Sequence, residues 1–245
     1  MLSTTAAHQV SAPRLPAPRG PLSTAVLEIL RGRATAAATQ IDPSTIEQAD
    51  PYGEDLQLGL YCCYELHCRG FAAVSEDLEW DPGLLAVRRQ LEQPFLAALR
   101  SEVCGGTDVT AEIDALLVEV IDAVGVSHHL RRTGQLWQLR EYVVHRSLYH
   151  LNEADPQAWV IPRLHGPGKA ALVTVEYDEY GSGHPTWMHA GLFAAMMTEL
   201  GLSAAYGAYL DAARAATLAE VNFMSLCGLH RRLRGALIGS SPPWS

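Results

Sequence analysis

The residues with the clearest capacity for chemistry are Glu179 and His189, which lie ten positions apart on either side of a Gly-Ser-Gly run at 181–183. A carboxylate and an imidazole together suit iron or manganese. On one straight helix they would lie about 15 Å apart along the axis, too far to bind one ion. The run at 181–185 can end a helix and restart it, so we expect the two side chains to converge. The alternative is an ordinary helix connection with a surface Glu and a half-buried His.

Two nearby groups of residues offer further donors. Glu176 lies three residues before Glu179 and could share its helix face, whereas Asp178 points about 100° away. Glu141 and His145 have the i,i+4 spacing that would allow both to bind one ion. Such pairs are common on exposed helix faces, and we expect this one to be of that kind.

Other charged residues have alternative structural roles. Glu65 lies four residues before Arg69, which favours a surface ion pair on a helix over a role as a further metal ligand. His230 with Arg231, Arg232 and Arg234 forms the strongest basic cluster, and two interpretations stay open. The cluster is either a clamp for an anion or substrate carboxylate, or a solvated helix end that pairs with nearby acids.

Helical periodicity dominates the chain, and the fold class that it predicts is all-α. Residues 173–175 have strand character but no partner run. Pro94 should kink or divide the helix that contains it, and residues 166–168 and 181–183 should separate helices. The predicted helices are 21–33, 54–71, 82–100, 110–124, 135–151, 168–177, 186–200 and 215–237.

Several short motifs occur in an order that resembles a known family. The motifs are Arg146-Ser-Leu-Tyr149, Glu153-Ala-Asp-Pro156, Pro162-Arg-Leu164, Asp178-Glu-Tyr-Gly181, His189-Ala-Gly-Leu-Phe193 and His230-Arg-Arg-Leu-Arg-Gly-Ala236. With these motifs the chain, from about Leu56 to Leu237, resembles the iron-containing redox enzymes, which belong with the haem-oxygenase-like diiron oxidases and oxygenases. The shared features are an acidic residue before a glycine, a later histidine, and an apolar helix that ends in Leu-Gly-Leu.

The resemblance implies a haem-oxygenase-like helical bundle that holds non-haem iron, ancestrally two ions, with manganese as an alternative. Glu179 and His189 would be ligands. Some relatives have a further carboxylate ligand on the preceding helix, a role that Glu153 could take, although it could also be an ordinary residue at a helix end. The implied activity is oxidation or oxygenation of a small organic substrate with O₂. Met188, Phe193, Met196 and Met197 are candidates for the apolar wall of such a site.

The resemblance also implies ligands beyond the 230–236 motif, where this sequence reads Leu-Ile-Gly-Ser-Ser-Pro-Pro-Trp-Ser. We therefore expect a bundle that is incomplete at its C-terminus. It would be either a truncated iron oxidase or a binding module, a pseudo-enzyme without catalysis. Iron binding should be weak and substoichiometric. An apolar face of Leu226, Leu229, Leu233 and Leu237 should be poorly covered, which favours self-association, for example as a homodimer.

Composition limits the remaining function classes. The formal net charge of −9 without a long basic stripe argues against nucleic acid as a partner. No apolar run is long enough for a membrane span, and five cysteines without C-x-x-C spacing favour reduced thiols in a cytoplasmic protein. The domain organisation predicted is a flexible, proline-rich tail over 1–21, a helical domain over 22–238 and a short irregular tail over 239–245.

Overall fold

The computed structural model describes residues 12–36, 41–103, 105–118 and 125–240. Within these ranges the regular structure is entirely helical, with α-helices joined by short 3-10 turns and no strands. The predicted all-α class is therefore confirmed, and residues 173–175 are helical. The tail predictions for 1–11 and 241–245 lie outside the described residues.

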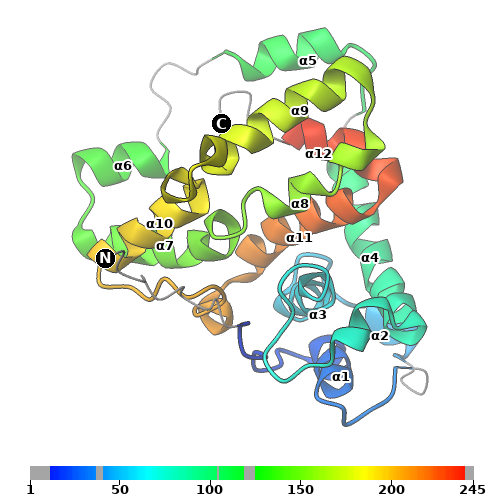
Figure 1. The fold of residues 1–245 in the computed structure, drawn as a ribbon. Coiled ribbons are helices and arrows are strands. Elements are labelled where there is room, and N and C mark those ends of the chain that lie inside the picture. Colours follow the sequence, from blue (N-terminus) through cyan, green and yellow to red (C-terminus); the bar gives the residue numbers. More distant parts are fainter. Residues whose placement is uncertain (1–11, 37–40, 104, 119–124, 241–245) are drawn as a thin grey trace, which may run out of the picture.

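Helix α3 lies at the centre of the N-terminal half. It packs against α1, α4 and the later helix α11, and its residues 56–65 are all buried. Figure 1 shows α11 between these N-terminal helices on one side and α7, α9 and α10 on the other. The helices of the N-terminal half are α1 (Pro21–Leu30), α2 (Pro43–Glu47), α3 (Glu54–Glu65), α4 (Pro82–Glu102) and α5 (Val109–Leu116).

The C-terminal half is built around α11, which contacts α3, α7, α8 and α12. Its α-helices are α6 (Val126–Arg132), α7 (Leu136–His150), α8 (Asp155–Ala158), α9 (Gly166–Glu179), α10 (His189–Glu199), α11 (Ala215–Leu229) and α12 (Arg234–Ser240). The 3-10 turns of the chain are η1 (Glu76–Trp80), η2 (Ile161–Arg163), η3 (Gly181–Gly183), η4 (Pro185–Trp187), η5 (Leu210–Ala212) and η6 (Arg231–Leu233).

A local signal explains where α4 begins, whereas packing explains why it continues past Pro94. Asp81 caps the helix, since its carboxylate accepts a hydrogen bond from the Leu84 backbone N–H at 2.8 Å. Pro94 was expected to kink or divide this helix, but α4 continues through it to Glu102. Leu91 and Phe95 on either side of Pro94 are fully buried, so packing against the core holds both halves in one helix.

The predicted helix over 215–237 is divided, which corrects the sequence prediction. Helix α11 ends at Leu229, and His230 has an extended backbone with φ −98° and ψ 107°. The imidazole Nε2 of His230 lies 2.9 Å from Glu92 Oε2 on α4, and the Arg163 side chain donates to the carbonyl oxygen of Gly228. These contacts with other elements turn the chain before α12 begins.

The leucine face that was predicted to be poorly covered is instead part of the core. Leu226 and Leu237 are buried, and Leu229 and Leu233 are partly buried against the same clusters. The division of the helix explains the error, because the turn at His230 folds α12 back onto α11.

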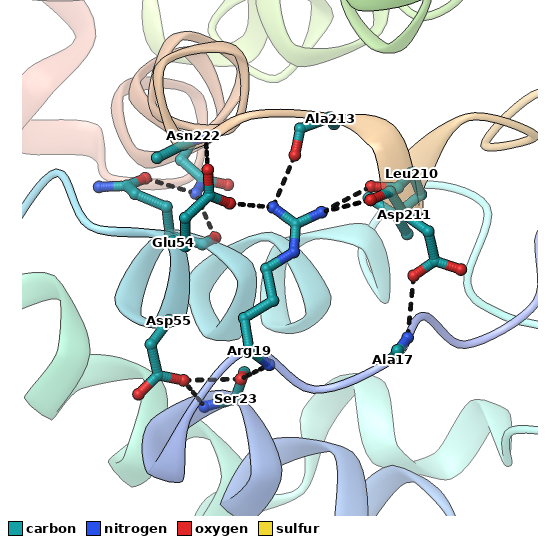
Figure 2. Close-up of polar contacts among 11 residues, drawn as sticks. Ala17, Arg19, Ser23, Glu54, Asp55, Leu210, Asp211, Ala213 and Asn222 are labelled. Atoms are coloured by element: carbon teal, nitrogen blue, oxygen red, sulfur yellow. Dashed lines mark hydrogen bonds and ion pairs between the residues drawn. The ribbon is translucent and has the colours of Figure 1, made fainter.

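Residues 12–21 were predicted to belong to a flexible tail, but they pack against the body of the fold. Pro13 and Pro16 are buried. The Arg19 guanidinium donates to the carbonyl oxygens of Leu210 and Ala213, at 2.9 and 2.6 Å, and pairs with Glu54 (Figure 2). The N-terminal segment is thus connected to α3 and to the chain before α11.

Three of the described cysteines belong to the hydrophobic core. Cys62, Cys63 and Cys227 are free and buried, and burial raises the pKa of the Cys63 thiol to about 12. Cys104 lies outside the described residues. Over the described ranges, no helix combines the length and apolar character that a membrane crossing needs.

Candidate metal centre

The break between α9 and α10 has the geometry that its glycines require. Gly181 has φ +70° and Gly183 has φ +84°, conformations that L side chains rarely adopt. A Cβ atom at Gly181 would lie 2.6 Å from the backbone nitrogen of Met188, so a larger residue would push the two sides of the turn apart. The chain therefore reverses tightly between Glu179, the last residue of α9, and His189, the first of α10.

This reversal brings the two predicted ligands together, as expected. Glu179 Oε2 and His189 Nδ1 lie 2.7 Å apart. The Glu179 side chain is 4 % exposed, whereas that of His189 is 44 % exposed. The site therefore has one buried carboxylate and one imidazole that solvent can reach.

Glu153 joins this pair from the turn that follows α7. One donor atom from each of Glu153, Glu179 and His189 lies within 4.8 Å of the others. The proximity that a ligand role for Glu153 requires is therefore present. We call these three residues the carboxylate–histidine cluster.

The donor atoms of the cluster are incompletely satisfied. Glu179 Oε2 is buried and makes no hydrogen bond among the described residues, although His189 Nδ1 lies 2.7 Å from it as an ion-pair partner. Both carboxylate oxygens of Glu176, one helical turn earlier, are also buried without hydrogen bonds. Buried carboxylate oxygens normally have partners, and a cation is the partner that would satisfy several at once.

Electrostatics at the cluster also favour a cation. Burial and the charge of Glu153 raise the pKa of Glu179 above its ordinary value. Burial, with the charges of Glu179 and Asp155, raises the pKa of Glu176 to about 7. Burial acts in the same direction on Glu153, but the hydrogen bond and charge of His150, a hydrogen bond from Tyr149 and the charge of His189 together outweigh it and lower the pKa of that carboxyl. Since acidic groups crowd one another here, a bound cation would stabilise their ionised forms.

His150 is a residue beside the cluster that the sequence analysis did not select. Its Nδ1 lies 3.1 Å from Glu153 Oε2, and its ring packs against Phe193 at 4.7 Å between centroids. These contacts fix how Glu153 faces the cluster. An i,i+3 spacing between His150 and Glu153 was the available sequence signal.

A cavity of about 40 Å³ adjoins the cluster. Met188 contributes an apolar wall, and Arg69 lies at its edge, where its guanidinium is 3.5 Å from Asp155. A water molecule needs roughly 10–15 Å³ of such space, so the cavity can hold an ion and a water but not an organic substrate. Of the other predicted wall residues, Met197 is buried in a separate core cluster and Met196 is exposed.

The other candidate carboxylates lie apart from the cluster. Glu141 is exposed, as expected, and lines a separate open hollow with His145. Glu65 was predicted to be a surface residue paired with Arg69, and this is wrong. Glu65 is buried and accepts a hydrogen bond from the Tyr206 hydroxyl at 2.7 Å, because α3 is covered on all sides.

The residues present fit a small metal ion. Bond lengths near 2.1 Å place ligand atoms of one ion at most about 4.2 Å apart, so the cluster needs to close by only a few tenths of an ångström. Two carboxylates balance the charge of a divalent cation, and an oxygen-rich set with one imidazole suits iron or manganese. The fold and the site thus define a helical bundle with a candidate metal site.

Comparison with known proteins agrees with this class. The family model described as iron-containing redox enzyme, of haem-oxygenase-like type, matches residues 140–241. The match contains all three residues of the carboxylate–histidine cluster. No curated protein matches the chain.

Proposed function

We propose that the protein is a non-haem iron-dependent oxidase or oxygenase that acts on a small organic substrate with O₂. The observation that carries this proposal is the convergence of Glu153, Glu179 and His189 inside the segment that matches the iron-containing redox enzymes. The match supports iron and an oxidoreductase role, and the cluster supplies the residues that would hold the ion.

Each residue has a distinct role in this proposal. Glu179 and Glu153 provide anionic ligands, and His189 provides the neutral one. His150 orients Glu153 through its hydrogen bond at 3.1 Å, as outer partners of metal ligands commonly do. When bound, iron would supply the site for O₂ activation. Because the adjoining cavity is small and the His189 side chain is 44 % exposed, the substrate would approach from the His189 side.

A second candidate function is a helical binding module that retains the iron site without turnover. It is favoured by the number of protein ligands, since the described residues bring three donor groups to the cluster, enough for one ion rather than two. The two candidates differ in what O₂ does to the bound iron.

The test is anaerobic loading with one equivalent of iron(II), followed by exposure to O₂ and absorption spectroscopy of ferric iron. The proposed oxidase should oxidise bound iron(II) faster than the Glu179→Ala variant under the same conditions. Iron that stays bound and ferrous in air would identify the binding module. A chain that retains no more iron than the variant would contradict both candidates.

A further inference from the structure

A second polar site lies away from the carboxylate–histidine cluster, between α4 and the turn at the end of α11. It is a cavity of about 480 Å³. Arg88, Arg89 and Glu92 line it from α4, and His230 and Arg232 line it from the opposite side. Cavities that bind small organic molecules usually have volumes of about 300–1,000 Å³.

Glu92 organises the inner wall of this cavity. Its buried carboxylate accepts a hydrogen bond from the Tyr64 hydroxyl at 3.1 Å and lies 2.9 Å from His230 Nε2. Arg88 Nε lies 3.2 Å from the same carboxylate, and the Arg88 guanidinium also contacts His67 Nε2 at 2.6 Å. The carboxylate of Glu92 is therefore fully engaged by residues of the protein, and it holds Arg88 in place.

Arg89 and Arg232 differ from Arg88 because neither side chain has a hydrogen bond or ion pair to the described residues. Both are exposed at the mouth of the cavity. With three arginines against one glutamate, the lining carries two positive charges without an acidic counterpart. This contrasts with the chain as a whole, which has a net charge of −9, so the cavity is a local focus of positive potential.

We propose that this cavity binds a small organic dianion, with Arg89 and Arg232 as the residues that hold its charged groups. The planar guanidinium group forms paired hydrogen bonds with carboxylate or phosphoryl oxygens. Leu85 and Leu96 also line the cavity and provide an apolar wall for a carbon body. Both interpretations of the basic cluster therefore apply to different residues: His230 pairs with the acid Glu92, and Arg232 serves the proposed anion clamp.

The test measures binding of inorganic phosphate and of succinate to the full chain by isothermal titration calorimetry at constant ionic strength. We expect one saturable site for at least one of these probes. Arg89→Gln and Arg232→Gln should each weaken binding about tenfold, because each removes a charge-assisted contact. Both side chains are exposed, so the variants should fold normally, which circular dichroism checks.

Arg131→Gln is the matched control, because Arg131 is also exposed and lies on α6. It should bind the probes as the wild type does. A preference for succinate would assign the site to dicarboxylates, and a preference for phosphate would assign it to phosphorylated molecules. The proposal is overturned if neither probe binds, or if the Arg89→Gln/Arg232→Gln double variant binds as tightly as the Arg131→Gln control.

Discussion

Glu179 Oε2 and His189 Nδ1 lie 2.7 Å apart, although one residue ends a helix and the other begins the next. The two 3-10 turns between them, η3 and η4, close a distance that a continuous helix would hold at about 15 Å. The proposed iron site therefore depends on the backbone of this turn as much as on the ligands themselves.

The first prediction concerns the two glycines of the turn. Gly181→Ala should lower both stability and iron affinity, because its Cβ would meet the Met188 nitrogen at 2.6 Å and displace the start of α10. Gly183→Ala is the matched control, since Gly183 also has positive φ but its Cβ would be 4.0 Å from the nearest atom. The control should lose about 1–2 kcal/mol of stability from its backbone conformation alone.

Thermal unfolding and iron(II) titration of both variants measure the difference. Gly181→Ala should bind iron at least tenfold more weakly than Gly183→Ala. Equal iron affinities for the two variants would show that the turn does not position His189.

The second prediction concerns the buried carboxyl of Glu65. Burial raises its pKa from 4.5 to about 7 in the folded chain. The folded state therefore holds a proton that the unfolded state releases first, and stability should fall as pH rises from about 4.5 to 7. Because one pKa unit corresponds to about 1.36 kcal/mol, the free energy of unfolding should fall by about 3 kcal/mol over this range.

Glu65→Gln should remove that part of the pH dependence and be more stable than the wild type above pH 7. Gln can still accept the hydrogen bond from Tyr206. Urea unfolding at several pH values measures the effect, with Glu199→Gln on the surface of α10 as the control. If the Glu65→Gln and Glu199→Gln curves run parallel, the Glu65 carboxyl does not titrate in this range.

The third prediction concerns the N-terminal segment that Figure 2 shows around Arg19. Arg19→Ala should destabilise the fold by about 2–3 kcal/mol, because it removes charge-assisted hydrogen bonds to the carbonyls of Leu210 and Ala213. Arg14→Ala, at an exposed position of the same segment, should change stability by less than about 0.5 kcal/mol. Chemical denaturation measures the free energy of unfolding of both variants. Equal losses in the two variants would contradict the anchoring role of Arg19.

The sequence was sufficient for features that depend on local chemistry. The glycine turn at 181–183 and the convergence of Glu179 with His189 follow from residues within one short segment. The sequence was insufficient where distant elements decide the outcome. Glu65 is buried because Tyr206, 141 positions away, covers it, and the helix predicted over 215–237 divides where His230 meets Glu92, 138 positions away.

The most direct test of the central claim is the amount of iron that the chain retains. After anaerobic loading with iron(II) and desalting, the wild type should hold up to one ion per chain. Glu179→Ala and His189→Ala should each lose nearly all of it, and Glu141→Ala, an exposed carboxylate outside the cluster, should retain the wild-type amount. Equal iron in the wild type and the Glu179→Ala variant would contradict an iron site at the carboxylate–histidine cluster.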